Sequence, residues 1–181
     1  MILFLVGFMG SGKSYMGRRL AALTGLPFRD LDQVIEANEG RTIAEIFKIE
    51  GEAYFRARER YWLEQISVEC LEGERPGGRQ TGDLQAIIST GGGAPCFGDN
   101  MDWMNQHGIT IWLNPPMEVL LERLERENIH RPVLEGKHGE ALKGLVEDRL
   151  RHRTPFYSQS RIEVTAARPD ARNILETIDY A

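Results

Sequence analysis

The segment GFMGSGKS at residues 7–14 decides the fold of this chain. It matches the phosphate-binding pattern G-x-x-x-x-G-K-[ST] in full. The apolar run ILFLV at residues 2–6 precedes it and is typical of a strand buried on both faces of a parallel sheet. Residues 13–23 follow with apolar side chains at helical spacing, and Gly25 and Pro27 end that pattern. The pattern therefore stands between a strand and a helix, which is the context that it requires.

Each part of this loop has a chemical role toward a nucleotide. The glycines let backbone N–H groups turn toward phosphates, and the helix N-terminus adds its positive end. Lys13 can reach the β- and γ-phosphates, and Ser14 can bind Mg²⁺ directly. The residues that we expect to bind ATP here are Gly10, Ser11, Gly12, Lys13, Ser14 and Tyr15.

Strand and helix patterns alternate along the rest of the chain. We expect further strands near Phe28 and at residues 84–88, 109–113 and 162–164. The helical patterns cover residues 31–37, 42–49, 52–71, 117–127, 140–154 and 170–178. This alternation predicts an α/β fold of three layers, with a central parallel five-stranded sheet flanked by helices. In such sheets ligands bind at the carboxyl ends of the strands.

Composition and charge limit the class of protein. The 181 residues suit a single domain spanning residues 1–181, and 41% hydrophobic with 27% charged residues is ordinary for a globular chain. Counting 22 Lys and Arg against 27 Asp and Glu gives a net charge of −5, which argues against a nucleic-acid or membrane surface. Cys70 and Cys96 match no metal or redox spacing. We expect a soluble, cytoplasmic monomer without a signal peptide or membrane span.

A pair of carboxylates follows the second expected strand. Many proteins with this loop carry an Asp at the end of another buried strand, but the strand at residues 84–88 ends in Ser89 and Thr90. Asp30 and Asp32 instead lie at the same sheet edge as the loop, and alternation along an extended chain sends both to one side. One could serve the metal while the other accepts a proton from an attacking hydroxyl. Taken alone, such a pair is more often a helix cap.

The chain resembles the shikimate kinase family of small-molecule P-loop kinases. The motifs that carry the resemblance occur in the family's order over nearly the whole chain. They are the P-loop at 7–14, D-x-D at 30–32, G-E-x-x-F-R at 51–56, the triple glycine at 91–93, R-P-x-L at 131–134 and R-x-P-x-Y at 153–157.

The resemblance implies roles for individual residues on the acceptor side. Arg56 and Arg153 match the family's carboxylate-binding arginines, and Asp32 matches the carboxylate that binds the acceptor hydroxyl and serves as its base. Asp30 matches the residue that holds Mg²⁺ through water, with Ser89 assisting. The acceptor-binding residues that it implies are Asp32, Arg56, Gly91, Gly92, Gly93 and Arg153, and the helical region around them spans about residues 31–60.

The resemblance also implies a mobile lid at about residues 128–139. Arg131 matches the lid arginine that reaches the transferring phosphate, so the catalytic residues would be Lys13, Asp32 and Arg131. Arg131 and Arg168 join the ATP-binding set. Arg123 and Arg126 both precede the lid, either could contact nucleotide, and of the two we expect Arg126. The implied reaction is Mg·ATP-dependent phosphorylation of the 3-hydroxyl of shikimate, in aromatic amino-acid biosynthesis.

Alternatives remain at this stage. A kinase of another small polyol acid such as gluconate, or a nucleoside monophosphate kinase, would share the P-loop and a lid. Arg56 with Arg153 favours a carboxylate acceptor. A P-loop nucleotide-binding regulator is a rival of another class, although the guanine-reading pattern N-K-x-D is absent from the sequence.

Overall fold

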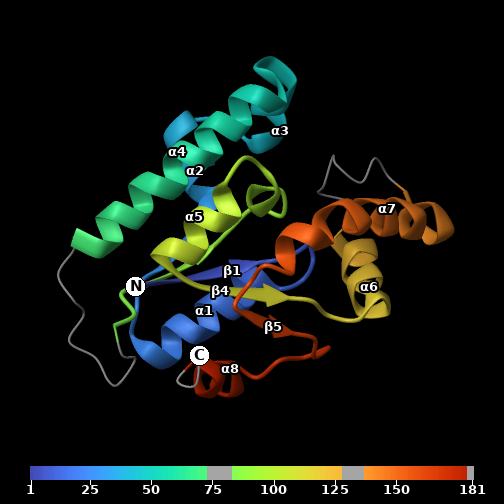
Figure 1. Cartoon of the computed structure of the whole chain (residues 1–181). Coiled ribbons are helices and arrows are strands. Elements are labelled where there is room, and N and C mark those ends of the chain that lie inside the picture. Colours follow the sequence, from blue (N-terminus) through green and yellow to red (C-terminus); the bar gives the residue numbers. More distant parts are fainter. Residues whose placement is uncertain (73–82, 128–136, 179–181) are drawn as a thin grey trace.

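A computed structural model describes residues 1–72, 83–127 and 137–178 of the chain. Its centre is one sheet of five parallel strands in the order β2-β3-β1-β4-β5 (Figure 1). The strands are β1 (Ile2–Val6), β2 (Phe28–Asp30), β3 (Ala86–Ser89), β4 (Gly108–Leu113) and β5 (Ile162–Val164). The expected three-layer α/β fold with a five-stranded parallel sheet is confirmed.

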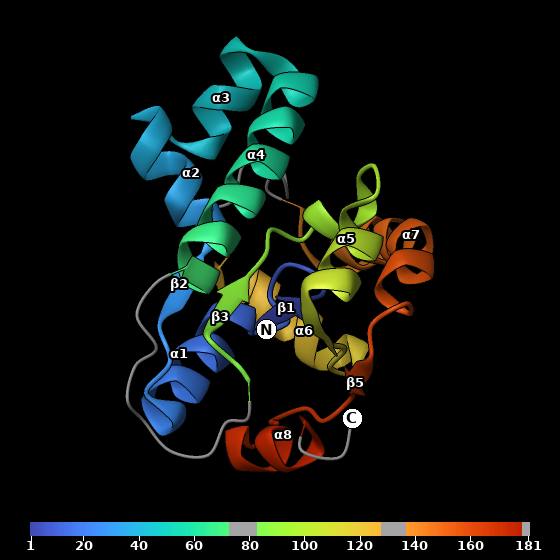
Figure 2. The same cartoon turned by 60° about the vertical axis from the view of Figure 1, so that its left-hand side comes forward.

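Helices cover both faces of the sheet (Figures 1 and 2). Two lie on one face, α1 (Lys13–Thr24) and α8 (Ala171–Ile178). The other face carries α4 (Gly51–Glu72), α5 (Asn100–His107) and α7 (Gly139–Tyr157). Three more α-helices are described: α2 (Leu31–Glu39) and α3 (Ile43–Ile49) pack on α4, and α6 (Met117–Glu127) packs on α7. Among the described residues, no helix is long and apolar enough to cross a membrane.

The central strand β1 is buried on both faces, which explains why its sequence contains no polar residue. Alternate side chains point to opposite sides of a strand. Ile2, Phe4 and Val6 therefore pack into the core beneath α4, α5 and α7, whereas Leu3 and Leu5 pack beneath α1 and α8. All five are fully buried. The strand that leads into the P-loop is thus held firmly from both sides.

Two expected boundaries shift for identifiable reasons. The strand expected at residues 84–88 begins at Ala86 and includes Ser89, which pairs in register with Leu5. The helix expected to end at Thr154 continues through Pro155 to Tyr157. A proline near a helix C-terminus removes one backbone hydrogen bond. The buried Tyr157 side chain anchors this last turn.

The sequence patterns predicted no helix in one region that is helical in the structure. Residues 94–107 form a short 3-10 helix, η1 (Ala94–Cys96), followed by α5. Both elements are short, and α5 starts without a side-chain cap on its N-terminal N–H groups. Asn100 holds them together because its side-chain amide donates to the Ala94 carbonyl oxygen at 2.8 Å. A tertiary contact of this kind overrides a weak local pattern.

A close approach of backbone atoms makes Gly108 essential to the sheet. A Cβ atom at this first residue of β4 would lie 1.9 Å from the carbonyl oxygen of Ile2. Gly108→Ala should therefore lower the free energy of unfolding by about 3 kcal/mol, because a core strand must move. Urea unfolding measures this change.

Gly144 provides the matched control for that experiment. It lies inside α7, and a Cβ there would meet nothing within 4 Å. Gly144→Ala should leave stability unchanged or raise it by about 0.5–1 kcal/mol through helix propensity. Equal effects of the two substitutions would contradict this account of Gly108.

Candidate functional site

The P-loop has the geometry of a phosphate cradle. Gly12, at the N-terminal cap of α1, has a φ of 96°, a backbone conformation that suits glycine and turns the chain into the helix. The Lys13 side chain folds over the loop, where its Nζ donates to the carbonyl oxygens of Gly7 and Phe8 at 2.9 Å each. The N-terminus of α1 and this ammonium present positive charge at one end of the sheet.

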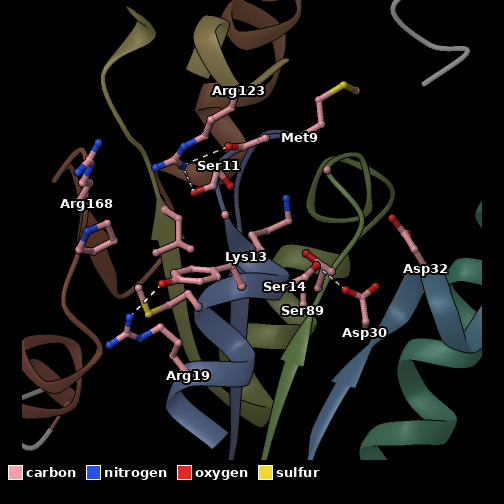
Figure 3. A pocket seen from close by; sticks show the side chains of 18 of the residues that line it. Met9, Ser11, Lys13, Ser14, Arg19, Asp30, Asp32, Ser89, Arg123 and Arg168 are labelled. Carbon is pink, nitrogen blue, oxygen red and sulfur yellow. Dashed lines mark hydrogen bonds between the residues drawn. The ribbon is translucent and has the colours of Figure 1, made fainter. Parts of the chain in front are cut away.

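The strand register brings a carboxylate to this loop. Leu5 of β1 pairs with Ser89 of β3, and Ser89 pairs with Asp30 of β2. The Ser14 hydroxyl donates to Asp30 Oδ2 at 2.5 Å (Figure 3). Asp30 is the N-cap residue of α2, but its side chain makes no capping hydrogen bond. It is committed to Ser14 instead.

The expected arrangement of the two aspartates needs a correction. Asp30 is the last residue of β2, but Asp32 lies in the first turn of α2 and not on an extended chain. Strand alternation therefore does not relate the two carboxylates. The turn into the helix still allows both residues to line the same cavity (Figure 3).

That cavity has a volume of about 720 Å³ and lies at the carboxyl ends of β1, β2 and β3. It brings together most residues that the sequence singled out for nucleotide and metal: Gly10, Ser11, Gly12, Lys13, Ser14, Tyr15, Asp30, Asp32, Ser89, Gly92 and Arg168. Arg56, Gly91, Gly93 and Arg153 are not among its lining residues. They adjoin it through Gly92, the middle glycine of the triple.

Three glycines in a row allow charged side chains to meet at one place. A Cβ at Gly91 would lie 2.7 Å from Asp32 Oδ1, and one at Gly93 would lie 2.5 Å from Arg56 Nη2. At Gly92 it would lie 3.3 Å from Arg153 Nη1. Side chains from α2, α4 and α7 thus converge on this loop, where the absence of Cβ atoms leaves room for them. We name residues 91–93 the glycine loop.

Glu59 belongs to this cluster, and the sequence analysis did not identify it. Its side chain is 1% exposed, and Oε2 accepts from Arg56 Nη1 at 2.5 Å. Among the described residues, its Oε1 atom has no hydrogen-bond partner, and a Cβ at Gly91 would lie 2.8 Å from it. Burial raises the pKa of Glu59 to about 7, against the opposing effect of Arg56, and Asp32 adds to the rise. Glu59 could have been identified from the sequence, because it lies three residues after Arg56 on an expected helix and such residues are neighbours on the helix surface.

Arg123, not Arg126, faces the P-loop. Arg123 Nη1 donates to the carbonyl oxygens of Gly10 and Ser11 at 3.2 and 3.1 Å (Figure 3). Its Nη2 donates to the carbonyl oxygen of Ala167 at 2.9 Å. Arg126 pairs with Glu122, and its side chain is 75% exposed. The expectation for Arg126 was therefore wrong.

Other expected residues stand at the rim or outside the described chain. Tyr15 is exposed, and its hydroxyl accepts from Arg19 Nη1 at 2.9 Å. Arg168 lines the cavity across from α1 (Figure 3). Arg131 and most of the lid expected at 128–139 lie outside the described residues.

The donor set near the P-loop fits a hard divalent cation. Hydroxyl and carboxylate oxygens such as those of Ser14 and Asp30 are the ligands that Mg²⁺ prefers, and it usually takes further ligands from substrate phosphates and water. Within the described ranges, no cluster of three or more His, Cys, Asp or Glu could hold a metal by itself. Both cysteines are free thiols.

Comparisons with known proteins show which family this chain is similar to. The family model described as shikimate kinase matches residues 9–179. A shikimate kinase from Parabacteroides distasonis is 42% identical over 163 residues, which cover 90% of this chain and 86% of that protein.

Two solved structures extend the likeness to three dimensions. The crystal structure of shikimate kinase from Bacteroides thetaiotaomicron gives a TM-score of 0.84 at 35% identity, covering 99% of this chain and 97% of that one. Shikimate kinase from Acinetobacter baumannii, in complex with shikimate, gives 0.78 at 33% identity, covering 98% and 89%. The chain described here belongs to the shikimate kinase family, whose members are ATP-dependent kinases.

Proposed function

We propose that this chain transfers the γ-phosphoryl group of ATP to the 3-hydroxyl of shikimate, giving shikimate 3-phosphate and ADP in aromatic amino-acid biosynthesis. One observation carries the proposal. The glycine loop gathers Asp32, Arg56 and Arg153 directly beside the P-loop. Two arginine forks suit a carboxylate, and a carboxylate with backbone N–H groups suits hydroxyls. A small hydroxylated acid therefore fits next to the donor phosphates.

The nucleotide end rests on the P-loop. Residues 10–15 would enclose the phosphates, with the Lys13 ammonium on the β- and γ-phosphates. Arg123 is fixed by three carbonyl oxygens, so its planar guanidinium can stack on the adenine base, and Pro169 also lines the cavity. Arg168 and Tyr15 complete the rim of this end.

Mg²⁺ would sit between Ser14, as a direct ligand, and Asp30, through water. When bound, the ion neutralises charge on the β- and γ-phosphates. Asp30 lies in register with Ser89, so the sheet itself sets where this carboxylate stands. Asp30 and Ser14 thereby hold the phosphate end in one orientation.

The acceptor end supplies orientation and a proton acceptor. Arg56 and Arg153 would hold the carboxylate of shikimate, and the glycine loop would hold its ring close to the backbone. Asp32 would orient the 3-hydroxyl and accept its proton as the hydroxyl oxygen attacks the γ-phosphorus. Catalysis of this kind depends mainly on position and on charge stabilisation, to which Lys13 and Arg131 would contribute.

The remaining expectations stay predictions. They are a single kinase domain over residues 1–181, an acceptor-binding helical region at about 31–60, and a lid at about 128–139 that brings Arg131 to the phosphate. A monomer that acts in the cytoplasm on a small molecule, without nucleic-acid or membrane partners, completes this set.

Acceptor choice is the direct test of the proposed function. ADP release should be measured with Mg·ATP alone and with added shikimate, gluconate or AMP. Shikimate should raise the rate about a hundredfold or more over the acceptor-free rate, because an aligned acceptor replaces water. Stimulation by gluconate or AMP instead would assign the enzyme to another substrate, and equal slow release in all mixtures would indicate a nucleotide-binding regulator.

Arg153→Lys separates the acceptor end from the nucleotide end. Lysine keeps the charge but loses the planar fork that binds a carboxylate with two parallel hydrogen bonds. The KM for shikimate should rise about tenfold to a hundredfold, and the KM for ATP should change by less than about threefold. Steady-state kinetics with each substrate varied measures both. Arg151→Lys, on the same helix with a 76% exposed side chain, is the control. Equal rises in both KM values would contradict a specific role of Arg153 in binding the acceptor.

Glu59 should make stability depend on pH. The carboxyl pKa is about 7 in the folded chain and 4.5 as its ordinary value, so the folded state binds more protons between these pH values. Its ionisation therefore lowers stability as the pH rises through this window. The advantage of Glu59→Gln over the unmodified protein should grow by about 2 kcal/mol between pH 5 and pH 8.

Urea unfolding at both pH values measures this difference. Glu118→Gln, at an exposed position of α6, controls for the loss of one negative charge. A difference for Glu59→Gln that stays constant from pH 5 to pH 8 would show that this carboxyl does not titrate in the window.

A further inference from the structure

Tyr157 is a fully buried residue at the end of α7. Its ring packs against Trp112 of β4, with centroids 5.8 Å apart and planes at 40°. Phenylalanine would fill the same space and make the same ring contact. Because burying a hydroxyl costs free energy unless it is hydrogen-bonded, the hydroxyl at this position calls for a separate explanation.

The Tyr157 hydroxyl donates a hydrogen bond to the carbonyl oxygen of Gly92. Burial raises the pKa of this hydroxyl well above its usual range, so it remains a donor at all working pH values. Gly92 is the middle residue of the glycine loop. The bond therefore ties the C-terminal turn of α7 to the loop around which the acceptor-side residues gather.

Gly92 is also the point where the acceptor side meets the P-loop. A Cβ there would lie 3.3 Å from the backbone nitrogen of Met9 and 3.5 Å from the carbonyl oxygen of Gly7. The same Cβ would lie 3.3 Å from Arg153 Nη1. Arg153 and Tyr157 are four residues apart on α7, so they lie on one helical face. One helix face thus holds the glycine loop against the P-loop.

We propose that Tyr157 is a positioning residue for phosphoryl transfer, which it serves by fixing the glycine loop against the P-loop through the Gly92 carbonyl. The inference rests on the proposed function, in which the glycine loop holds the acceptor and the P-loop holds the donor. In-line transfer requires the attacking oxygen within about 3–3.5 Å of phosphorus, and a misplacement of about 1 Å costs about a hundredfold in rate. Tyr157 is not among the residues that line the cavity, and it acts through the distance between the two loops.

Tyr157→Phe removes this hydrogen bond while keeping the buried ring. The kcat for shikimate phosphorylation should fall about tenfold to a hundredfold, and the KM values for ATP and shikimate should change by less than about threefold. A loss confined to kcat marks misalignment of two bound substrates. Circular dichroism and thermal unfolding of the same preparation establish that the variant is folded at the assay temperature.

Ser67→Ala is the matched control for lost stability. Ser67 is buried in α4, and its hydroxyl donates to the carbonyl oxygen of Leu63 at 2.6 Å. This variant also loses a buried hydroxyl that donates to a backbone carbonyl, at a place outside both substrate ends. Its melting temperature should fall comparably while its kcat stays unchanged.

The outcomes separate the inference from the function on which it rests. An unmodified protein that does not phosphorylate shikimate overturns the proposed function. An active unmodified protein whose Tyr157→Phe variant keeps its kcat overturns only the positioning role, whatever happens to KM. Equal losses of kcat in Tyr157→Phe and Ser67→Ala also overturn it, because they would trace the effect to general destabilisation.

Discussion

The parallel register of three strands is the constraint on which the site depends. Leu5, Ser89 and Asp30 lie side by side at the carboxyl ends of β1, β3 and β2. Because the strands run in one direction, the three segments that leave them start at the same edge. The P-loop, the glycine loop and the turn into α2 therefore inherit their relative positions from backbone hydrogen bonds. Burial of β1 on both faces makes this edge rigid.

The glycine loop lies at that sheet edge and leaves room for charged side chains to approach one another. Without Cβ atoms at residues 91–93, the Arg56, Arg153 and Asp32 side chains reach the backbone itself. Bringing Glu59 into the same cluster has an energetic cost, because a buried ion pair seldom recovers the hydration that it loses. The Arg56–Glu59 pair is therefore better explained by the orientation that it gives the Arg56 guanidinium than by a gain in stability. Function and stability oppose each other at this point of the fold.

Local patterns predicted the elements that depend on local physics. The bounds of β1, α6 and β5 agree with the sequence expectation to the residue, because each is a strongly apolar or strongly periodic segment. The P-loop residues were identifiable for the same reason, since one short segment carries the whole cradle. The acceptor-side residues came from a resemblance, because no local pattern relates Arg56 on α4 to Arg153 on α7.

What the sequence missed depends on contacts between distant segments. Arg123 and Arg126 share one helix, and only the packing of α6 decides which of them meets the P-loop. Leu120 and Leu124 are the buried residues described in that helix, and Arg123 is three residues after Leu120, which places it near the buried face. The bond from Tyr157 to Gly92 joins residues 65 positions apart and leaves no trace in either local pattern.

The net charge of the chain is negative, whereas several cationic side chains gather at the site. The whole chain carries −5, yet Lys13, Arg123 and Arg168 line a cavity that Arg56 and Arg153 adjoin. Both proposed reactants are anions, so the relevant field is the local one within a Debye length of about 8 Å. Acidic side chains elsewhere on the surface are screened from the cavity by salt, whereas the cationic groups act at contact distance. A protein of net negative charge can therefore bind two anions side by side. In the proposed function the charge of Asp30 is balanced by Mg²⁺, and Asp32 accepts the proton of the acceptor hydroxyl.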